Sequence, residues 1–149
     1  MNWSPHVTVA AVIEKDNRFL MVRETSNDAK IVINQPAGHW ENHETLEQAV
    51  IRETLEETAH EFIPQGLVGC YQWKLPQSDK TYLRFCFHGE AGNPHTEMTL
   101  DDGIISAEWF SLEELIEQKE SLRSPMVLLC IQDYLAGKRY PIDVVTWVA

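Results

Sequence analysis

Residues 38–60 decide the fold of this chain; they read GHWENHETLEQAVIRETLEETAH. Thr45, followed three residues later by Gln48, forms a capping box, so we expect a helix to begin near Leu46. The apolar residues that follow recur at helical spacing and form a stripe that should face the protein core.

Three glutamates continue this stripe toward the end of the helix. Glu53, Glu56 and Glu57 stand at i, i+3 and i+4, so they share one face. Like charges on a half-buried face repel one another and are costly to desolvate, and Arg52 alone does not neutralise all three. Mg²⁺, or Mn²⁺ as a substitute, prefers such oxygen ligands and shares them with substrate phosphates. The alternative interpretation is a solvated acidic helix face, which is common in acidic proteins.

The full spacing resembles the signature of the Nudix hydrolases, which cleave nucleoside diphosphates linked to another group and related pyrophosphates. The matching residues are Gly38, Glu44, Arg52, Glu53, Glu56 and Glu57. Residues 34–39, which read NQPAGH, also resemble the family loop that leads into the catalytic helix. The resemblance implies an α+β fold, namely an α/β/α sandwich with a mixed sheet, in one domain spanning residues 1–149.

Three positions depart from the family pattern. The family prefers aliphatic residues where Thr54 and His60 stand, and glycine where Ala59 stands. A glycine at a helix end often adopts positive φ, so alanine there is expected to cost about 1 kcal/mol. None of these departures removes a charged residue of the signature, so we expect activity to be retained.

The resemblance implies a role for each signature residue. Glu53, Glu56 and Glu57, with the backbone carbonyl of Gly38, would hold the metal ions, and Glu53 would act either as a ligand or as the base that activates water. Arg52 would orient a signature glutamate, and Glu44 would support the loop and helix through Arg52. The alternative for the last two is an ordinary surface ion pair.

Candidate substrate contacts lie outside the helix. They are Arg23, Gln35, Trp73, Tyr82 and Arg84. An arginine within a strand can clamp phosphate, and aromatic side chains can stack on a planar base. The alternatives are an outward-facing arginine and aromatic side chains that belong to the core. The polar segment at residues 90–102 should be a mobile loop, which contains His95, Glu97, Asp101 and Asp102. The resemblance implies that an acidic residue of this loop assists the metal site, and the sequence does not choose among them.

Apolar and polar periodicity predicts the remaining elements. Expected strands cover residues 7–13, 19–23, 31–33, 68–73, 82–87 and 104–110, with a turn at residues 15–17. Ser111 should cap a short helix, and a last helix should cover residues 126–136 before Gly137.

Composition limits the class of protein further. The chain has 149 residues with 44% hydrophobic content, which suits one domain with a full core. A net charge of −11 argues against a nucleic-acid polymer as ligand. No apolar run is long enough for a membrane span, the start lacks a secretory signal pattern, and the three cysteines show no paired spacing. We therefore expect a cytoplasmic protein, either a monomer or a homodimer.

A narrower resemblance covers nearly the whole chain. Residues 122–125 (LRSP), 72–73, 83–85 and the tail at residues 134–141 look like a bacterial Nudix phosphatase subgroup. Its members act on nucleoside tri- and diphosphates and on hydroxymethylpyrimidine pyrophosphate and release orthophosphate. Two alternatives remain: a MutT-like sanitiser of oxidised nucleotides that releases pyrophosphate, and a Nudix-fold module that binds a nucleotide without cleaving it.

Overall fold

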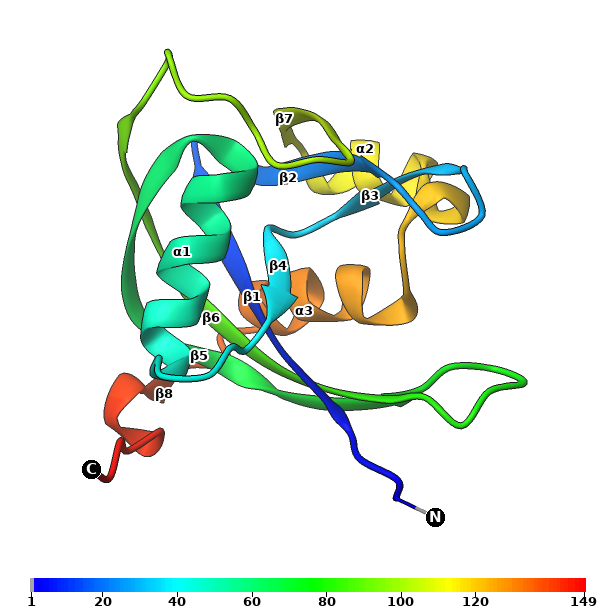
Figure 1. Cartoon of the computed structure of the whole chain (residues 1–149). Coiled ribbons are helices and arrows are strands. Elements are labelled where there is room, and N and C mark those ends of the chain that lie inside the picture. Colours follow the sequence, from blue (N-terminus) through cyan, green and yellow to red (C-terminus); the bar gives the residue numbers. More distant parts are fainter. Residues whose placement is uncertain (1) are drawn as a thin grey trace.

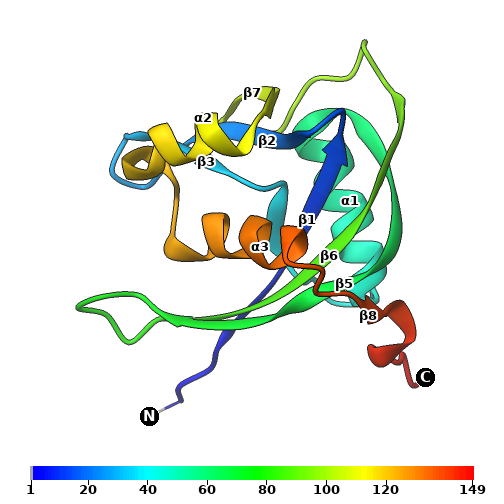
Figure 2. The ribbon, with the colours of Figure 1, turned by 180° about the vertical axis from the view of Figure 1, so that it is seen from behind.

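The computed structural model describes residues 2–149, which form a mixed sheet with helices on both sides (Figures 1 and 2). The strands are β1 (His6–Lys15), β2 (Arg18–Thr25), β3 (Ile31–Asn34), β4 (Ala37–His39), β5 (His60–Lys74), β6 (Thr81–Pro94), β7 (Ile104–Phe110) and β8 (Tyr140–Pro141). The helices are α1 (Leu46–Thr58), α2 (Leu112–Glu117) and α3 (Pro125–Leu135), with short 3₁₀ turns at Lys119–Ser121 and Ile142–Val144. Strand β1 pairs in parallel with β6 and antiparallel with β2 and β4. The predicted α+β class with a mixed sheet is confirmed.

Strand β1 separates two cores because both of its faces are covered. Val9 and Ile13 pack in the core that includes Ala49 and Val50 of α1. Their neighbours Ala10 and Val12 face the other way, into the core that contains residues of α2 and α3. Side chains alternate across a strand, so a strand between two layers must be apolar on both faces. This explains the nearly unbroken apolar run in this part of the sequence.

The turn between β1 and β2 has the predicted chemistry. Asp16 and Asn17 take φ values of 52° and 64°, and Lys15 pairs with Arg18 across them. Two consecutive residues with positive φ give a hairpin turn whose twist matches that of the strands, and Asp and Asn tolerate this conformation best after glycine.

Helix α1 begins and ends as its sequence indicates. Both hydrogen bonds of the Thr45–Gln48 capping box are present, so the predicted start is confirmed. At the other end Ala59 lies in the left-handed region, with φ 58° and ψ 21°, and its N–H donates to the carbonyl of Leu55. The chain therefore keeps the helix-ending conformation for which glycine is suited, although an alanine occupies it.

The prediction of one mobile loop over residues 90–102 is wrong in its first part. Strand β6 continues to Pro94 and pairs with an equally extended β5, in which Phe62 lies opposite Ala91 and Ile63 opposite Glu90. Strand β5 breaks register at three places, so its bulges obscure the two-residue periodicity by which a strand is recognised. The strands predicted at residues 68–73 and 82–87 are therefore only parts of a longer ribbon.

Two further elements were absent from the predicted set. Strand β4 occupies the segment that was expected to be loop, and β8 in the tail pairs with Gly66 and Leu67 of β5. Among the helices of residues 2–149, none combines the length and the apolar composition that a membrane span requires.

We predict that Ala59→Gly stabilises the protein by about 1 kcal/mol, because glycine occupies the left-handed region without the steric cost that alanine has there. For a chain of this size the melting temperature should rise by about 2–4 °C. Ala136→Gly is the matched control, because Ala136 ends α3 at an ordinary φ of −74°. It should lower the melting temperature or leave it unchanged; a rise in this control as large as that at Ala59 would contradict the explanation.

Candidate functional site

The segment after β3 lies against helix α1. It forms one side of the candidate site. The Ala37 N–H donates to Glu57 Oε1 at 2.9 Å, which ties β4 to the last turn of α1. At the next residue, Gly38, a Cβ atom would overlap the carboxylate of Glu53. Glycine is required at this position because the Glu53 carboxylate lies directly against the backbone.

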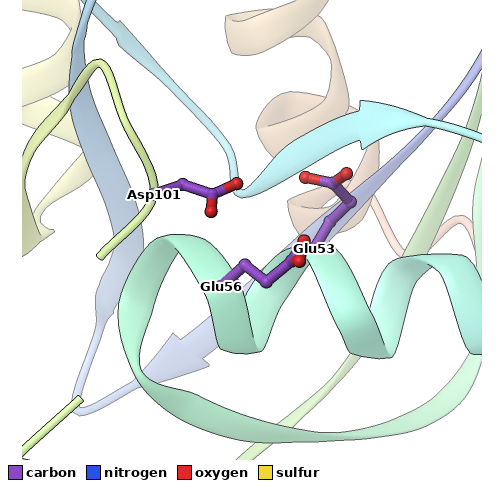
Figure 3. A group of neighbouring side chains, drawn as sticks. All are labelled: Glu53, Glu56 and Asp101. Carbon is purple, nitrogen blue, oxygen red and sulfur yellow. The ribbon is translucent and has the colours of Figure 1, made fainter. Parts of the chain in front are cut away.

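Three carboxylates converge between α1 and this segment (Figure 3). One oxygen each from Glu53, Glu56 and Asp101 lie within 4.8 Å of one another. Glu53 is buried, Glu56 is half-buried and Asp101 is exposed, so the cluster runs from the interior to the surface. The Asp101 N–H donates to the carbonyl of Glu56 at 3.0 Å, which fixes the loop before β7 on the end of α1. The cluster offers only carboxylate oxygens, beside the backbone of Gly38, and oxygen atoms are the hard ligands that Mg²⁺ and Mn²⁺ prefer.

Arg52 is the cation of this cluster. Its guanidinium contacts Glu53 at 2.7 Å, Glu56 at 3.0 Å and Glu44 at 2.8 Å, and it also donates to the carbonyl of His39. The hydrogen bond from Arg52 lowers the pKa of Glu44. One guanidinium therefore joins the loop to the helix, but its single charge is shared among several carboxylates.

Glu57 is buried like Glu53, but it is not one of the three members of the cluster. Burial raises the pKa of Glu57 to about 9, against the opposing effect of the hydrogen bond from Ala37, and the nearby charges of Glu24, Glu53 and Asp101 raise it further. Burial also raises the pKa of Glu53, although Arg52 opposes this shift. Without a cation, two glutamates of the helix are thus held where their ionised forms are disfavoured.

A second ion pair lies behind Glu57. Arg123 Nη1 donates to Glu24 Oε2 at 2.8 Å, and Asn34 donates to the same oxygen at 3.3 Å. Glu24 is buried, and its charge is close enough to Glu57 to raise the pKa of Glu57. This pair therefore connects the segment before α3 with β2 and, through Asn34, with the end of β3.

Gln35 and Arg84 lie inside the protein, where their polar groups contact each other. Arg84 is only 4% exposed and donates to Gln35 Oε1 at 2.8 Å and to Asn34 Oδ1 at 3.1 Å. Gln35, fully buried, donates in turn to the carbonyl of Val127 in α3. Both residues were predicted as substrate contacts, but these bonds hold the loop before Gly38 in place, and we do not propose that they touch substrate.

The other predicted contacts are spread over the fold. Arg23 pairs with Glu108 at 2.7 Å and lies over the ring of Phe110. Both partners belong to β7, so the guanidinium is paired there and does not join the acidic cluster. Trp73 and Tyr82 face each other across β5 and β6 and stack with ring centroids 5.9 Å apart. Of the pair, Trp73 lines a surface cavity beside α3.

Sequence reasoning left two parts of the site open. Asp101 was only one of three acidic candidates, because nothing local distinguishes it from Asp102. Glu24 was not predicted, since it looks like an ordinary strand-end glutamate; the only signal is Arg123, in the LRSP stretch that contacts it.

The chain is similar to proteins of known family. A sequence model of the NUDIX domain matches residues 4–130. Phosphatase NudJ of Escherichia coli (strain K12) is 42% identical over 144 residues, which cover 96% of this chain and 92% of the relative. A solved NUDIX hydrolase from Nitrosomonas europaea is 46% identical, with a TM-score of 0.95 over 97% of this chain and 98% of its own. A MutT NUDIX hydrolase from Burkholderia pseudomallei, 20% identical with a TM-score of 0.74 over 88% of this chain and 98% of its own, shares the fold.

Fold, acidic site and relatives together define an enzyme that hydrolyses pyrophosphate bonds. The chain belongs to the Nudix hydrolase family, as the domain match and the identity to Phosphatase NudJ show.

We predict that Glu57→Gln raises the melting temperature of the metal-free protein at pH 8. Because the folded-state pKa of Glu57 is raised to about 9, its stability contribution is complete below the unfolded value near 4.5 and is lost as the pH rises through 9. Glutamine imitates the neutral form, so the gain over wild type should grow between pH 5 and pH 9 in thermal melts with EDTA.

Added Mg²⁺ should stabilise wild type more than Glu57→Gln, since an ion that binds the folded state raises its stability. Glu47→Gln, an exposed change in the first turn of α1, is the matched control and should follow wild type. A Glu57→Gln variant that is less stable than wild type in EDTA at every pH would contradict this electrostatic explanation.

Proposed function

We propose that this enzyme carries out Mg²⁺-dependent hydrolysis of nucleoside tri- and diphosphates or of hydroxymethylpyrimidine pyrophosphate, with release of orthophosphate. The observation that carries the proposal is the cluster of Glu53, Glu56 and Asp101 against the backbone of Gly38. The name of the NudJ relative, a phosphatase, supports the product assignment.

Each residue of the site would have its own role in the reaction. Glu53, Glu56 and Asp101 would hold the cation, with Glu57 and the Gly38 carbonyl as further ligands beneath them. A bound divalent cation supplies the positive charge that neutralises phosphate oxygens and lowers the pKa of water. Arg52 holds Glu53 and Glu56 in orientation through its bonds of 2.7 and 3.0 Å. A carboxylate of the cluster accepts the proton of the attacking water.

Net charge supports a small substrate. The chain has a formal charge of −11, which disfavours a nucleic-acid polymer, whereas a bound cation reverses the field locally for a small phosphorylated molecule. We also propose a cytoplasmic location, which the free thiols of Cys70, Cys86 and Cys130 support.

The experiment is a product assay with Mg²⁺ and a panel of UTP, UDP, hydroxymethylpyrimidine pyrophosphate and an oxidised guanosine triphosphate. We predict orthophosphate as the product and a loss of at least about 100-fold in kcat for Glu56→Gln, because one carboxylate of the cluster is removed. Glu47→Gln, on the same helix but outside the cluster, should retain the wild-type rate.

Other outcomes select the alternatives. Pyrophosphate released from the oxidised nucleotide would identify a MutT-like sanitiser instead. Binding of these compounds by the wild type with no turnover would favour a module that senses nucleotides. Equal rates for Glu56→Gln and wild type would show that the acidic cluster is not the site of reaction.

A further inference from the structure

Two of the three cysteines lie in the core between the sheet and α3. Cys86 of β6 and Cys130 of α3 are both fully buried and belong to the same hydrophobic cluster. The third cysteine, Cys70 of β5, is exposed and is not part of this cluster. The fold therefore brings together two thiols that are distant in the sequence and come from different elements.

Arg84 is the buried cation beside these thiols. It stands two positions before Cys86 on β6, so both side chains point to the same face of the strand. Arg84 Nη1 lies 4.0 Å from Cys130 Sγ on that face. Its other partners are the neutral amide oxygens of Gln35 and Asn34, and within residues 2–149 no carboxylate pairs with it and its Nε has no hydrogen-bond partner. A buried charge without a counter-ion is costly, so an anion beside this guanidinium is stabilised.

The two thiols differ in acidity. A hydrogen bond from Cys86 lowers the pKa of Cys130 against the effect of burial, and the charge of Arg84 lowers it further. Burial and the hydrogen bond with Cys130 raise the pKa of Cys86. The thiolate is the nucleophilic form of cysteine, so Cys130 has the character of an attacking sulfur and Cys86 that of a resolving one.

We propose that Cys86 and Cys130 are a modification site, at which a peroxide forms a reversible disulfide. The Cys130 thiolate attacks one peroxide oxygen, the O–O bond breaks, and the sulfenic acid of Cys130 forms while hydroxide leaves and takes up a proton. The Cys86 sulfur then loses its proton and attacks the Cys130 sulfur, so that the S–S bond forms, the S–O bond breaks and water leaves. The two thiols lose two electrons, and one hydrogen peroxide becomes two waters.

The disulfide would act on the acidic site through Arg84 and Gln35. Gln35 accepts from Arg84 and donates to the carbonyl of Val127, which precedes Cys130 by about one turn of α3. The new bond moves the Cys130 sulfur toward Cys86, and we expect the bonds that hold the loop before β4 to rearrange with it. This second part rests on the proposed function, in which the acidic cluster beside that loop binds the cation.

The experiment uses Cys70→Ser, because the exposed Cys70 would otherwise react with peroxide. Oxidation of buried thiols requires local opening, so the folded protein is kept in hydrogen peroxide overnight, and the remaining thiols are blocked with N-ethylmaleimide as it is unfolded. Trypsin cleaves after lysine and arginine, which places Cys86 in residues 85–119 and Cys130 in residues 124–138. We expect mass spectrometry to find these peptides joined, with the loss of two hydrogen atoms, and to find them separate after dithiothreitol.

The matched control is Cys70→Ser/Cys130→Ala, which should give no joined peptide. Affinity for Mn²⁺, measured by electron paramagnetic resonance, tests the second part. Oxidised Cys70→Ser should bind Mn²⁺ at least about fivefold more weakly than the reduced protein, and dithiothreitol should restore the affinity. Peroxide should leave the affinity of the control unchanged.

Two results would overturn the modification site: both thiols still reduced after the treatment, and sulfinic acid at Cys130 without a joined peptide. Joined peptides with an unchanged affinity for Mn²⁺ would overturn the connection to the acidic site. Failure of the reduced protein to bind Mn²⁺ would instead contradict the proposed function, and the joined peptides would still establish the disulfide.

Discussion

The structure depends on one constraint, the burial of glutamate carboxylates of α1 against a backbone loop. Glu57 accepts the Ala37 N–H, and Glu53 fills the space that a side chain at Gly38 would need. Such groups are costly to desolvate, so the loop must be held firmly enough to keep them there. The buried bonds from Arg84 to Gln35 and from Gln35 to Val127 supply this support from the opposite side of the loop.

The same constraint prepares the site for its chemistry. Arg52 compensates the carboxylates that it touches, but burial still raises the pKa of Glu53 and Glu57. A hydrolase of pyrophosphate bonds needs positive charge at the phosphate oxygens, and a site with surplus carboxylates attracts a divalent cation that provides it. Fold stability and cation binding are therefore opposed at these residues, since folding buries carboxyl groups whose ionised forms are disfavoured and would be stabilised by a cation.

Local sequence predicted the parts of the fold whose signals are local. The Thr45–Gln48 box and the glutamate spacing fixed the start of α1 and its acidic face, and the apolar run in β1 predicted a buried strand. The extension of β6 to Pro94 was missed because it depends on pairing with a bulged β5. Asp101 could not be chosen over Asp102, since only tertiary contact with Glu56 distinguishes them.

The arginines show the same limit of prediction from local sequence. Arg84 and Arg23 both looked like phosphate contacts, because an arginine in a strand has the same sequence pattern whether it faces a ligand or a buried amide. In the structure each arginine has a different partner that is distant in sequence: Arg84 donates to Gln35, and Arg23 donates to Glu108. Arg123 pairs with Glu24, which is 99 residues away in the sequence, and this partner too is visible only in three dimensions.

The most direct test of the central claim is the affinity for Mn²⁺, measured by electron paramagnetic resonance on the wild type, Asp101→Asn and Asp102→Asn. Both aspartates are exposed, but only Asp101 is a member of the cluster, so the pair differs in position and not in chemistry. A cation held by Glu53, Glu56 and Asp101 predicts at least about tenfold weaker binding for Asp101→Asn and wild-type affinity for Asp102→Asn. Equal affinities in all three proteins, or no Mn²⁺ binding by the wild type, would contradict it.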